Sequence, residues 1–365
     1  MTYSIFAIAA NTISASGCAA YTFTLHGFLP YLRAPFYQFS EQNDDNVHTN
    51  GYQNPAFPFL TGHGGANQII PFGYLGLRTD QPIMFINPSL PPQIPYLRIR
   101  DIYFGGAGLA TTMNRTHTTI TRFSTANITS LTDKYASTSM PITVGVPGSD
   151  GPDTTYNVSI GETIYVTNRM YFENITYAGN LLQCKQVSSA DAYSPGQFPQ
   201  AAIDGAIATE WQPLSDITAS ILVNMAGSKY QSLSSIYFNW ASRPPHNATV
   251  YLGNSTKISN GVRQLDGEVR EIPIDGITPS DPYDAAKVAA ATVVPYVGNE
   301  TVLELGNNGM WTGDWVELVI EGCLEEDGEG RGATVAEFVL VGSEGVMQMG
   351  NVTMGGGFGN VTSGR

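Results

Sequence analysis

The sequence predicts a multidomain α+β protein in which a helical segment is followed by β-rich sequence. Residues 2–28 carry apolar side chains at helical spacing. From about residue 96 onward, short β-branched and aromatic runs are separated by Gly, Pro, Asn and Asp. The chain has 365 residues, of which 42% are hydrophobic, so it is long enough for two or three packed cores. We therefore expect helices first and stacked β-sheets after them.

The first 80 residues are expected to be helices joined by long loops. A second apolar stretch, from Ile69 to Leu77, follows a Gly-Gly-Ala-Asn-Gln start and extends this helical part. Five prolines between positions 81 and 100 then forbid a continuous helix and predict an extended connector. We place a domain boundary after residue 85, and we expect residues 86–178 to form this connector and a small β-domain.

The last large unit, residues 179–342, has the strand pattern of two stacked sheets. Six of its segments alternate or nearly alternate between apolar and polar residues, which predicts a β-sandwich or jelly roll. Its tryptophans Trp240, Trp311 and Trp315 are expected in the core rather than on a sugar-binding surface. Residues 343–365 have no periodic pattern, so a disordered Gly-rich tail is expected there. The six segments are 219–225, 235–240, 248–252, 300–305, 315–321 and 334–341.

The charge balance excludes two classes of partner. With 31 acidic and 17 basic residues, the net charge is -14, which repels phosphate backbones and anionic lipid surfaces. Nucleic acid is therefore not an expected partner. No apolar run approaches the roughly 18 residues that span a bilayer, and the Gly-rich C-terminus does not match a lipid-anchor signal. We expect no membrane association.

Nine Asn-x-Ser/Thr acceptors favour a glycoprotein of the secretory route over a chance excess of such triplets. The apolar segment Ile5–Ala10 lacks the basic flank of a signal peptide, so an export signal would have to lie outside this chain. The acceptors are Asn114, Asn127, Asn157, Asn174, Asn247, Asn254, Asn299, Asn351 and Asn360.

Residues 33–42 and 59–68 place one carboxylate, Glu41, among aromatic and amide side chains, a chemistry suited to a sugar-cleaving pocket. Glycoside hydrolysis normally uses two carboxyl groups, which stand about 6.5–9.5 Å apart in inverting enzymes. Asp44 and Asp45 share the loop of Glu41 and are poorly placed to act across a substrate. The other interpretation of Glu41 is a loop carboxylate that caps a helix or a turn.

These two segments, together with 87–96 and 116–119, resemble the C-terminal end of the catalytic region of fungal acid α,α-trehalases, in glycoside hydrolase family 65. The resemblance runs from about residue 3 to residue 342. It implies that residues 1–85 are the last helices of an (α/α)6 barrel that hydrolyses α,α-trehalose to glucose with inversion and without a catalytic cofactor. It also implies a truncated chain that lacks the general acid, so activity of the chain alone is doubtful.

The first domain offers five candidate site residues, Glu41 and His63 from the resemblance and Phe39, Gln42 and Asn67 from their side-chain chemistry, with core packing as the alternative for Phe39. Glu41 becomes the general base, and its Ser-Glu-Gln context resembles the base motif of glucoamylases. Phe39 is expected to stack on a sugar ring, and Gln42 and Asn67 are expected to bind its hydroxyls. His63 resembles the start of a helix whose amides point into a pocket. Without the resemblance, a histidine in a Gly-rich turn is more often structural.

Residues 197–205, 236–245 and 332–340 resemble the discoidin-like (F5/8 type C) module that ends those trehalases. In such modules the Asp-Gly turn resembles a Ca²⁺ site that is closed by an acidic residue on the last strand. The site residues here are Asp204, Thr209 and Glu337, whose hard oxygens suit structural calcium. The alternative is an Asx-turn made by Asp204 alone.

The three cysteines leave one unpaired. Cys184 and Cys323 bracket the discoidin-like region, as terminal cysteines often do in that family, and the resemblance therefore implies a Cys184–Cys323 disulfide. Cys18, in a stretch of small residues, is expected to be a buried free thiol.

The preferred function is therefore hydrolysis of trehalose or a related disaccharide by a secreted, cell-wall or vacuolar enzyme. One alternative is a non-catalytic carbohydrate-binding or cell-wall glycoprotein, in which the β-sandwich binds cell-wall carbohydrate. A family 65 phosphorylase is a third interpretation, and Glu41 disfavours it because an anionic side chain would repel phosphate.

Overall fold

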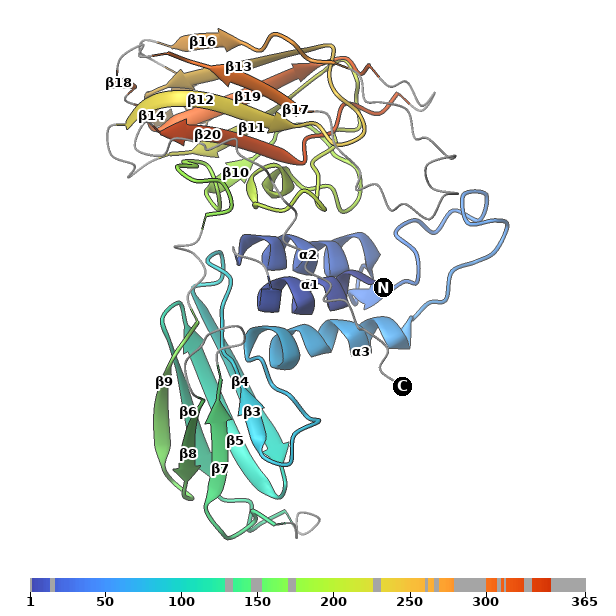
Figure 1. The fold of residues 1–365 in the computed structure, drawn as a ribbon. Coiled ribbons are helices and arrows are strands. Elements are labelled where there is room, and N and C mark those ends of the chain that lie inside the picture. The colour runs from blue at the N-terminus through green and yellow to red at the C-terminus, as the bar shows by residue number, and fades with distance from the viewer. Residues whose placement is uncertain are drawn as a thin grey trace, which may run out of the picture.

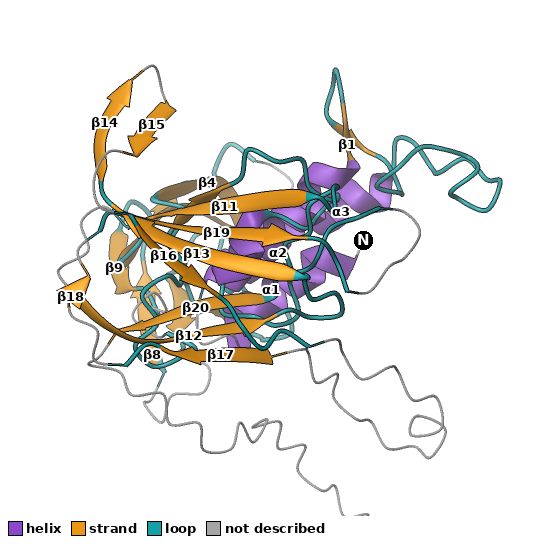
Figure 2. Ribbon diagram, turned by 90° about the horizontal axis from the view of Figure 1, so that it is seen from above, coloured by secondary structure: helices purple, strands orange, loops and turns teal. Residues whose placement is uncertain are grey.

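The structure is a computed structural model, and its elements form three tiers, with a β-sandwich above the helices and a small β-domain below them (Figure 1). Figure 2 shows the same arrangement from above, with the helices behind the strands of the sandwich. The structure describes residues 2–13, 17–128, 134–145, 153–169, 175–225, 231–259, 262–265, 269–278, 300–306, 310–311, 313–324 and 330–342.

The helical tier contains two short helices where the sequence predicts helix over 2–28. They are α1 (Thr2–Ile13) and α2 (Cys18–Phe28), and a one-turn 3-10 helix, η1 (Leu29–Tyr31), follows. A third helix, α3 (Leu60–Gln68), runs directly into the π-helical turn η2 (Ile69–Tyr74). Thr24 of α2 and the hydroxyl of Tyr74 are 2.7 Å apart, which ties the two parts together. The predicted (α/α)6 barrel stays an expectation.

A long loop joins η1 to α3 and extends to one side of the helices (Figure 2). It begins with a hairpin of two short strands, β1 (Leu32–Arg33) and β2 (Gln38–Phe39), which pair antiparallel. No described helix is both long enough and apolar enough to cross a membrane.

The small β-domain is built from two sheets. In the first, β3 pairs in parallel with β7, which pairs with β8; in the second the order is β4-β5-β6-β9, all antiparallel. One core contains side chains from both sheets and from the helices, including Ala7, Phe23 and Ile120. The strands are β3 (Met84–Ile86), β4 (Tyr96–Phe104), β5 (Ala107–Asn114), β6 (His117–Phe123), β7 (Met140–Val144), β8 (Thr154–Val158) and β9 (Thr163–Thr167).

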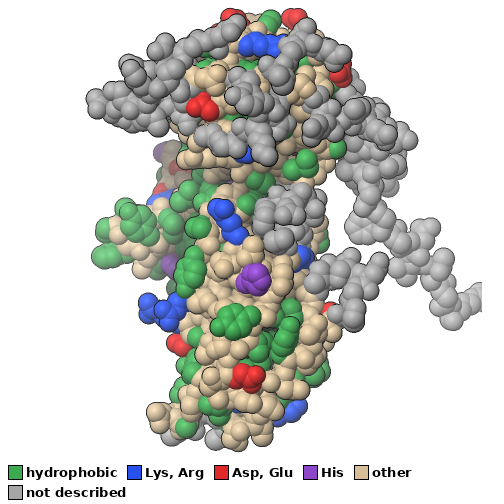
Figure 3. All heavy atoms as spheres, turned by 90° about the vertical axis from the view of Figure 1, so that its left-hand side faces the viewer, with side chains coloured by type: hydrophobic (Ala, Val, Ile, Leu, Met, Phe, Trp, Pro, Cys, Tyr) green, Lys and Arg blue, Asp and Glu red, His purple; other side chains and the backbone are tan. Residues whose placement is uncertain are grey.

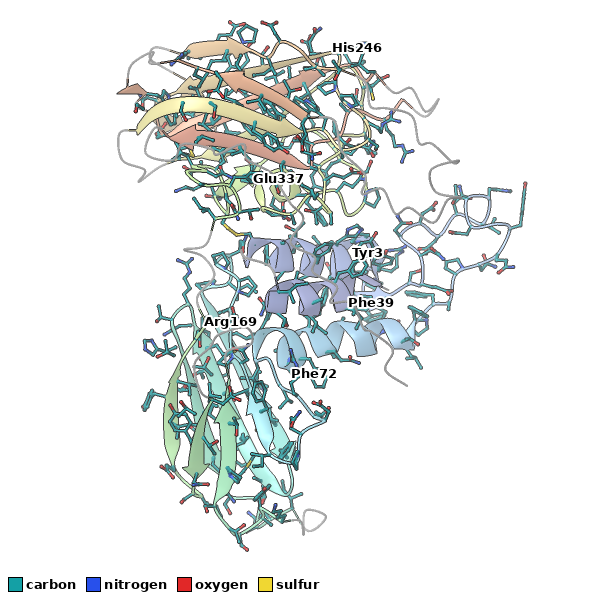
Figure 4. All side chains as sticks on the ribbon, viewed as in Figure 1. Tyr3, Phe39, Phe72, Arg169, His246 and Glu337 are labelled. Carbon is teal, nitrogen blue, oxygen red and sulfur yellow. A yellow bond between two sulfur atoms is a disulfide. The ribbon has the colours of Figure 1, made fainter. Side chains whose placement is uncertain are left out.

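The connector predicted between 81 and 100 includes β3, which lies across the proposed boundary after residue 85. Arg169, at the end of this domain, also reaches back to the helices (Figure 4). Its guanidinium donates to the main-chain oxygens of Asn11 and Thr12, the latter at 3.1 Å, at the C-terminal end of α1. Arg169 is partly buried, and this burial together with the charge of the nearby Arg78 lowers the pKa of its guanidinium to about 10.

The upper tier is the predicted β-sandwich. A five-stranded sheet of order β10-β11-β19-β13-β16 faces a sheet in which β12 pairs with β17, β18 and β20. All six strand segments predicted from the sequence are confirmed. The strands are β10 (Gln186–Ser188), β11 (Thr218–Asn224), β12 (Gln231–Asn239), β13 (Asn247–Gly253), β16 (Arg270–Pro273), β17 (Glu300–Glu304), β18 (Met310–Trp311), β19 (Trp315–Glu321) and β20 (Glu337–Gly342).

The core between the sheets is aromatic as well as aliphatic. Trp240 is fully buried in this core and Trp311 is nearly so, as predicted. Trp315 is also fully buried, but it lies on the side of β19 opposite Val316 and Leu318 and is not among the side chains of this core. Phe238 stacks on the Trp240 ring, with centroids 4.3 Å apart. A further hairpin, β14 (Ser255–Ser259) with β15 (Val262–Leu265), projects from the sandwich (Figure 2). The tail predicted for 343–365 lies outside the described residues.

The predicted cysteine pairing is wrong. Cys184 is joined to Cys18 of α2, with their Cα atoms 5.6 Å apart, and Cys323 lies buried in the sandwich core. Cys184 pairs with Cys18 because of tertiary packing, in which α2 packs against the first residues of the sandwich. The ring of His26, two turns after Cys18, lies 6.5 Å from the ring of Phe198. The disulfide therefore links the helical tier to the sandwich instead of closing the sandwich on itself.

Candidate functional site

Glu41 follows β2 and is held by the chain segment that leads into α3. Its amide donates to the oxygen of Ala56 at 3.0 Å, and its Oε2 accepts from the amide of Ala56, also at 3.0 Å. The side chain is exposed, and within the described residues Oε1 has no hydrogen-bond donor. Glu41 is therefore fixed through one oxygen and presents the other to solvent.

The two aspartates of this loop have structural partners. Asp45 accepts two hydrogen bonds from the Arg33 guanidinium and one from Ser40 Oγ at 2.8 Å, and the Arg33 bond holds the pKa of Asp45 below its usual value. Asp44 accepts from the Thr49 hydroxyl and the Asn46 amide, which lower its pKa. Both aspartates therefore shape the loop, which supports the expectation that neither acts across a substrate from Glu41.

Phe39 and His63 meet at the start of α3. Their rings are 5.0 Å apart in an edge-to-face arrangement, and His63 Nδ1 lies 3.0 Å from the oxygen of Phe59. Gly62 is buried beside them, and a Cβ there would come within 2.9 Å of the Cβ of Phe39. The strand end and the helix can therefore approach this closely only with glycine at position 62. Phe39 lies at the end of the helical tier from which the loop extends (Figure 4).

Phe39 is itself 5% exposed, so its ring packs against protein in this structure and is not open to a sugar. The side chains of Gln42 and Asn67 are exposed, and among the described residues neither side chain hydrogen-bonds Glu41. The structure therefore brings together Phe39 and His63, and ties Glu41 to the same segment, 56–59, that His63 contacts.

Sequence reasoning missed Arg33, which organises the Glu41 loop. Its guanidinium donates to the oxygens of Pro30 at 2.8 Å and Gln42 at 2.9 Å, in addition to Asp45. The sequence did offer a signal, because Arg33 is the single Arg or Lys in a loop that carries three carboxylates, and an ion pair could have been expected there.

Large apolar side chains are open to solvent over the helices and this loop. Phe36, Tyr52 and Leu60 are each more than three-quarters exposed. Where such side chains adjoin on a protein surface, they usually contact another protein part or a ligand. The other members are Ile5, Phe6, Ile13, Leu29, Tyr37 and Phe57.

The predicted calcium residues do lie together. Asp204 and Glu337 are completely buried, Asp204 accepts from the Thr209 hydroxyl at 2.9 and 3.0 Å, and Ala206 N donates to it at 2.9 Å. Within the described part of the chain, neither carboxylate oxygen of Glu337 has a partner in hydrogen-bond geometry. Glu337 lies on the side of the sandwich that faces the helices (Figure 4).

The electrostatics of this pair is unusual. Burial raises the pKa of Asp204 to about 7, although hydrogen bonds from Thr22 and Thr209 oppose the shift. Burial and the charge of Asp204 raise the pKa of Glu337 well above its usual range, although the backbone amides of Ala206 and Gly205 oppose the shift. A buried pair of carboxyls, in which neither oxygen of Glu337 has a partner in hydrogen-bond geometry among the described residues, fits either shared protons or a hard cation. Thr22, on α2, is a partner that no sequence signal pointed to.

Five of the nine predicted glycosylation acceptors are described, and all five are exposed. They are Asn114, Asn127, Asn157, Asn247 and Asn254; Asn174, Asn299, Asn351 and Asn360 lie outside the described residues.

No protein-family model matches the chain. Among curated proteins, it is 39% identical over 355 residues to the acid trehalase of Emericella nidulans and 41% identical over 366 residues to the cell wall acid trehalase of Arthroderma benhamiae. Each match covers 94% of this chain but only 33% and 34% of the relative, respectively. The cell wall acid trehalase of Candida albicans is 30% identical over 288 residues, covering 73% of the chain and 25% of the relative. The chain thus spans about a third or less of the length of the curated relatives it matches.

Among solved structures, the chitosan-binding module 1 of a Paenibacillus chitosanase/glucanase matches with a TM-score of 0.31 and 16% identity, covering 46% of this chain and 100% of the module. Module 2 of the same enzyme, in complex with chitotriose, matches with the same TM-score and identity, covering 45% of this chain.

Proposed function

We propose that this chain supplies the general base, one wall of the pocket and a β-sandwich module to an enzyme that hydrolyses α,α-trehalose. The observation that carries the proposal is similarity to fungal acid trehalases along 94% of the chain, at 39% and 41% identity. The position of Glu41 supports it. One oxygen is anchored on Ala56 and the other is open to solvent, as a base that must reach a water molecule requires.

The proposed reaction is a single displacement. Glu41 removes a proton from water as the water oxygen attacks the anomeric carbon, the glycosidic bond breaks, and the leaving glucose takes its proton from a carboxylic acid. Attack from the face opposite the leaving group inverts the configuration. Because Asp44 and Asp45 are engaged within the loop, we assign the acid to sequence that the relatives have beyond the matched third.

The exposed apolar surface of the helical tier and loop supports the same assignment, since those side chains would pack against the remaining part of such an enzyme.

A hybrid enzyme tests the proposal. The third of the Arthroderma benhamiae cell wall acid trehalase that this chain matches is replaced by this chain, and trehalose turnover is measured beside this chain alone. We expect turnover by the hybrid and none by the isolated chain. A correctly folded hybrid that does not turn over trehalose would contradict the proposal. Binding of cell-wall polysaccharide by the chain, without turnover in the hybrid, would favour the carbohydrate-binding alternative.

We also propose that the chain follows the secretory route to the cell exterior or the cell wall. The disulfide, the exposure of every described glycosylation acceptor, and the cell-wall, periplasmic and secreted relatives support this location.

We further propose a structural calcium ion at Asp204 and Glu337, with Thr209 as a neighbouring oxygen. The orphaned oxygens of Glu337 beside a second buried carboxylate support it. The ion would balance the charge of the pair and so hold the Asp204 turn against β20.

Calcium should raise the thermal midpoint more at neutral pH than at acid pH. Without a cation, both folded-state pKa values lie above the unfolded values near 4, so the stability contributed by the protonated pair is present below about pH 4. It is lost as the pH rises toward 7. Calcium at roughly 100 times its dissociation constant should then raise the midpoint by about 5–10 °C near pH 7.5.

The variant Glu337→Gln should reduce this calcium response, and Glu271→Gln, which changes an exposed carboxylate of the same sandwich, should retain it. An unchanged midpoint in the wild-type chain, measured by scanning calorimetry with and without Ca²⁺, would show that the pair holds protons instead.

A further inference from the structure

The sheet β4-β5-β6-β9 has one buried face and one face open to solvent. Its inward side chains, such as Leu109, Ile120 and Val166, belong to the core. On the outward face, side chains of residues that pair from strand to strand form rows across the sheet. One row runs Arg98, Thr112, Thr119 and Tyr165 across the four strands.

Aromatic rings stand at several points of this open face. Tyr96 is 58% exposed and Tyr165 is 69% exposed, although both lie in strands. Tyr103 and Phe123 make an edge-to-face pair, and the Phe123 ring covers Gly108, where a Cβ would come within 2.3 Å of it. Figure 3, which views the side on which β9 lies in Figure 1, shows separate hydrophobic groups and a histidine among polar surface in the lower half. Aromatic rings between hydroxyls on an open sheet face suit a sugar chain, whose rings have apolar faces and polar edges.

Asn114 ends β5 on this same face. It is directly opposite Tyr96 in the register, so their side chains are neighbours on one side of the sheet. Its Oδ1 accepts from the amides of Thr116 and His117, both at 2.8 Å, and from the Thr116 hydroxyl at 3.1 Å. Its Nδ2, the atom that an N-linked glycan would occupy, has no partner within the described residues. Asn114-Arg-Thr116 is one of the nine acceptor triplets.

We propose that the oligosaccharide carried by Asn114 lies on the open face of this sheet, with its first ring against Tyr96 and later rings crossing Thr112 and Thr119 toward Tyr165. This rests on the proposed secretory route. Two strand spacings, about 10 Å in all, separate β5 from β9, a span that a few sugar rings cover. The tether favours the chain's own glycan over a free polysaccharide, because attachment gives it a high effective concentration at the face.

The threonine hydroxyls of this face would hydrogen-bond the hydroxyl groups of the sugar rings. Thr112 and Thr119 hydrogen-bond one another, as do Thr121 and Thr163 at 2.8 Å, so each pair is held in place and retains free acceptor positions. The glycan would thus shield the two exposed tyrosines without a second protein.

A double-mutant comparison tests the contact on the full chain secreted from a eukaryotic host. Mass analysis of glycopeptides first gives the occupancy of Asn114. The thermal midpoint is then measured for Asn114→Gln, Tyr96→Ala and the double variant. We expect Asn114→Gln to lower the midpoint by about 2–4 °C in the wild-type background and by much less in the Tyr96→Ala background. Tyr96→Phe, which keeps the ring, should retain the full effect of Asn114→Gln.

Asn157→Gln is the matched control, because Asn157 is an exposed acceptor on β8 that lies opposite Pro141 and not opposite a tyrosine. Its effect should be the same in the wild-type and Tyr96→Ala backgrounds. An unoccupied Asn114, or an equal effect of Asn114→Gln in both backgrounds, would overturn the proposal. Trehalose turnover by the hybrid does not enter these readouts, so a failure here is distinct from a failure of the proposed function.

Discussion

In the hybrid enzyme, Glu41→Gln is expected to lower kcat for trehalose by about 10²–10⁴-fold and to leave KM nearly unchanged. The amide keeps the shape of the side chain, and its oxygen can still accept the hydrogen bond from Ala56, so the loop should stay in place. The amide cannot take a proton from water, and the expected loss of kcat comes from that difference alone.

Steady-state kinetics on the purified hybrid check this result. Asp80→Asn is the matched control, since Asp80 is an exposed carboxylate outside the Glu41 loop, and its kcat should stay at the level of the parent hybrid. Near-normal turnover by the Glu41→Gln hybrid would return Glu41 to a structural role in the loop. In the parent hybrid, nuclear magnetic resonance should show β-glucose formed at first in step with α-glucose, as inversion at one of the two anomeric carbons requires.

The second large expected effect is a loss of stability when the disulfide between the helical tier and the sandwich is removed. Cys184→Ser should lower the free energy of unfolding by about 5 kcal/mol in the chain-entropy model, because Cys18 and Cys184 are separated by 166 residues. Cys18→Ser should have a similar effect. Cys323→Ala should cost less, because it removes only a small buried thiol from the sandwich core.

Denaturant unfolding without reductant compares the three variants, and a non-reduced peptide map identifies the linked cysteines. A peptide that joins Cys184 to Cys323, or a larger loss for Cys323→Ala than for Cys184→Ser, would contradict the arrangement of the tiers.

Most strands of the sandwich could be predicted because they have one buried face. Alternation with period two is a local pattern, and β11, β13 and β19 carry it, whereas β20 is buried along its whole length and is recognisable by its apolar run. The helices were also predictable from the apolar spacing over residues 2–28, although that spacing did not show where the first helix ends and the second begins. Gly17 precedes Cys18 at the start of the second, and glycine lowers helix stability.

The contacts between tiers could not be predicted from local patterns. Cys18 meets Cys184 and Thr22 meets Asp204 only because α2 packs on the sandwich, and neither sequence segment carries a sign of the other. The hydrogen bond between Glu41 and Ala56 could not be predicted either, because it depends on how the loop folds back before α3. For the proposed calcium site, family resemblance pointed to Asp204, Thr209 and Glu337 together, and the burial of Glu337 explains why its oxygens need a partner.

Azide rescue of the hybrid that carries Glu41→Ala tests whether Glu41 is the base that activates the attacking water. If Glu41 activates water on the face opposite the leaving group, the shorter side chain leaves room there for azide, which needs no base. The account predicts that azide restores trehalose cleavage and that the product is β-glucosyl azide. No rescue in a folded hybrid that still binds trehalose, or a glucosyl azide of the α configuration, would contradict it.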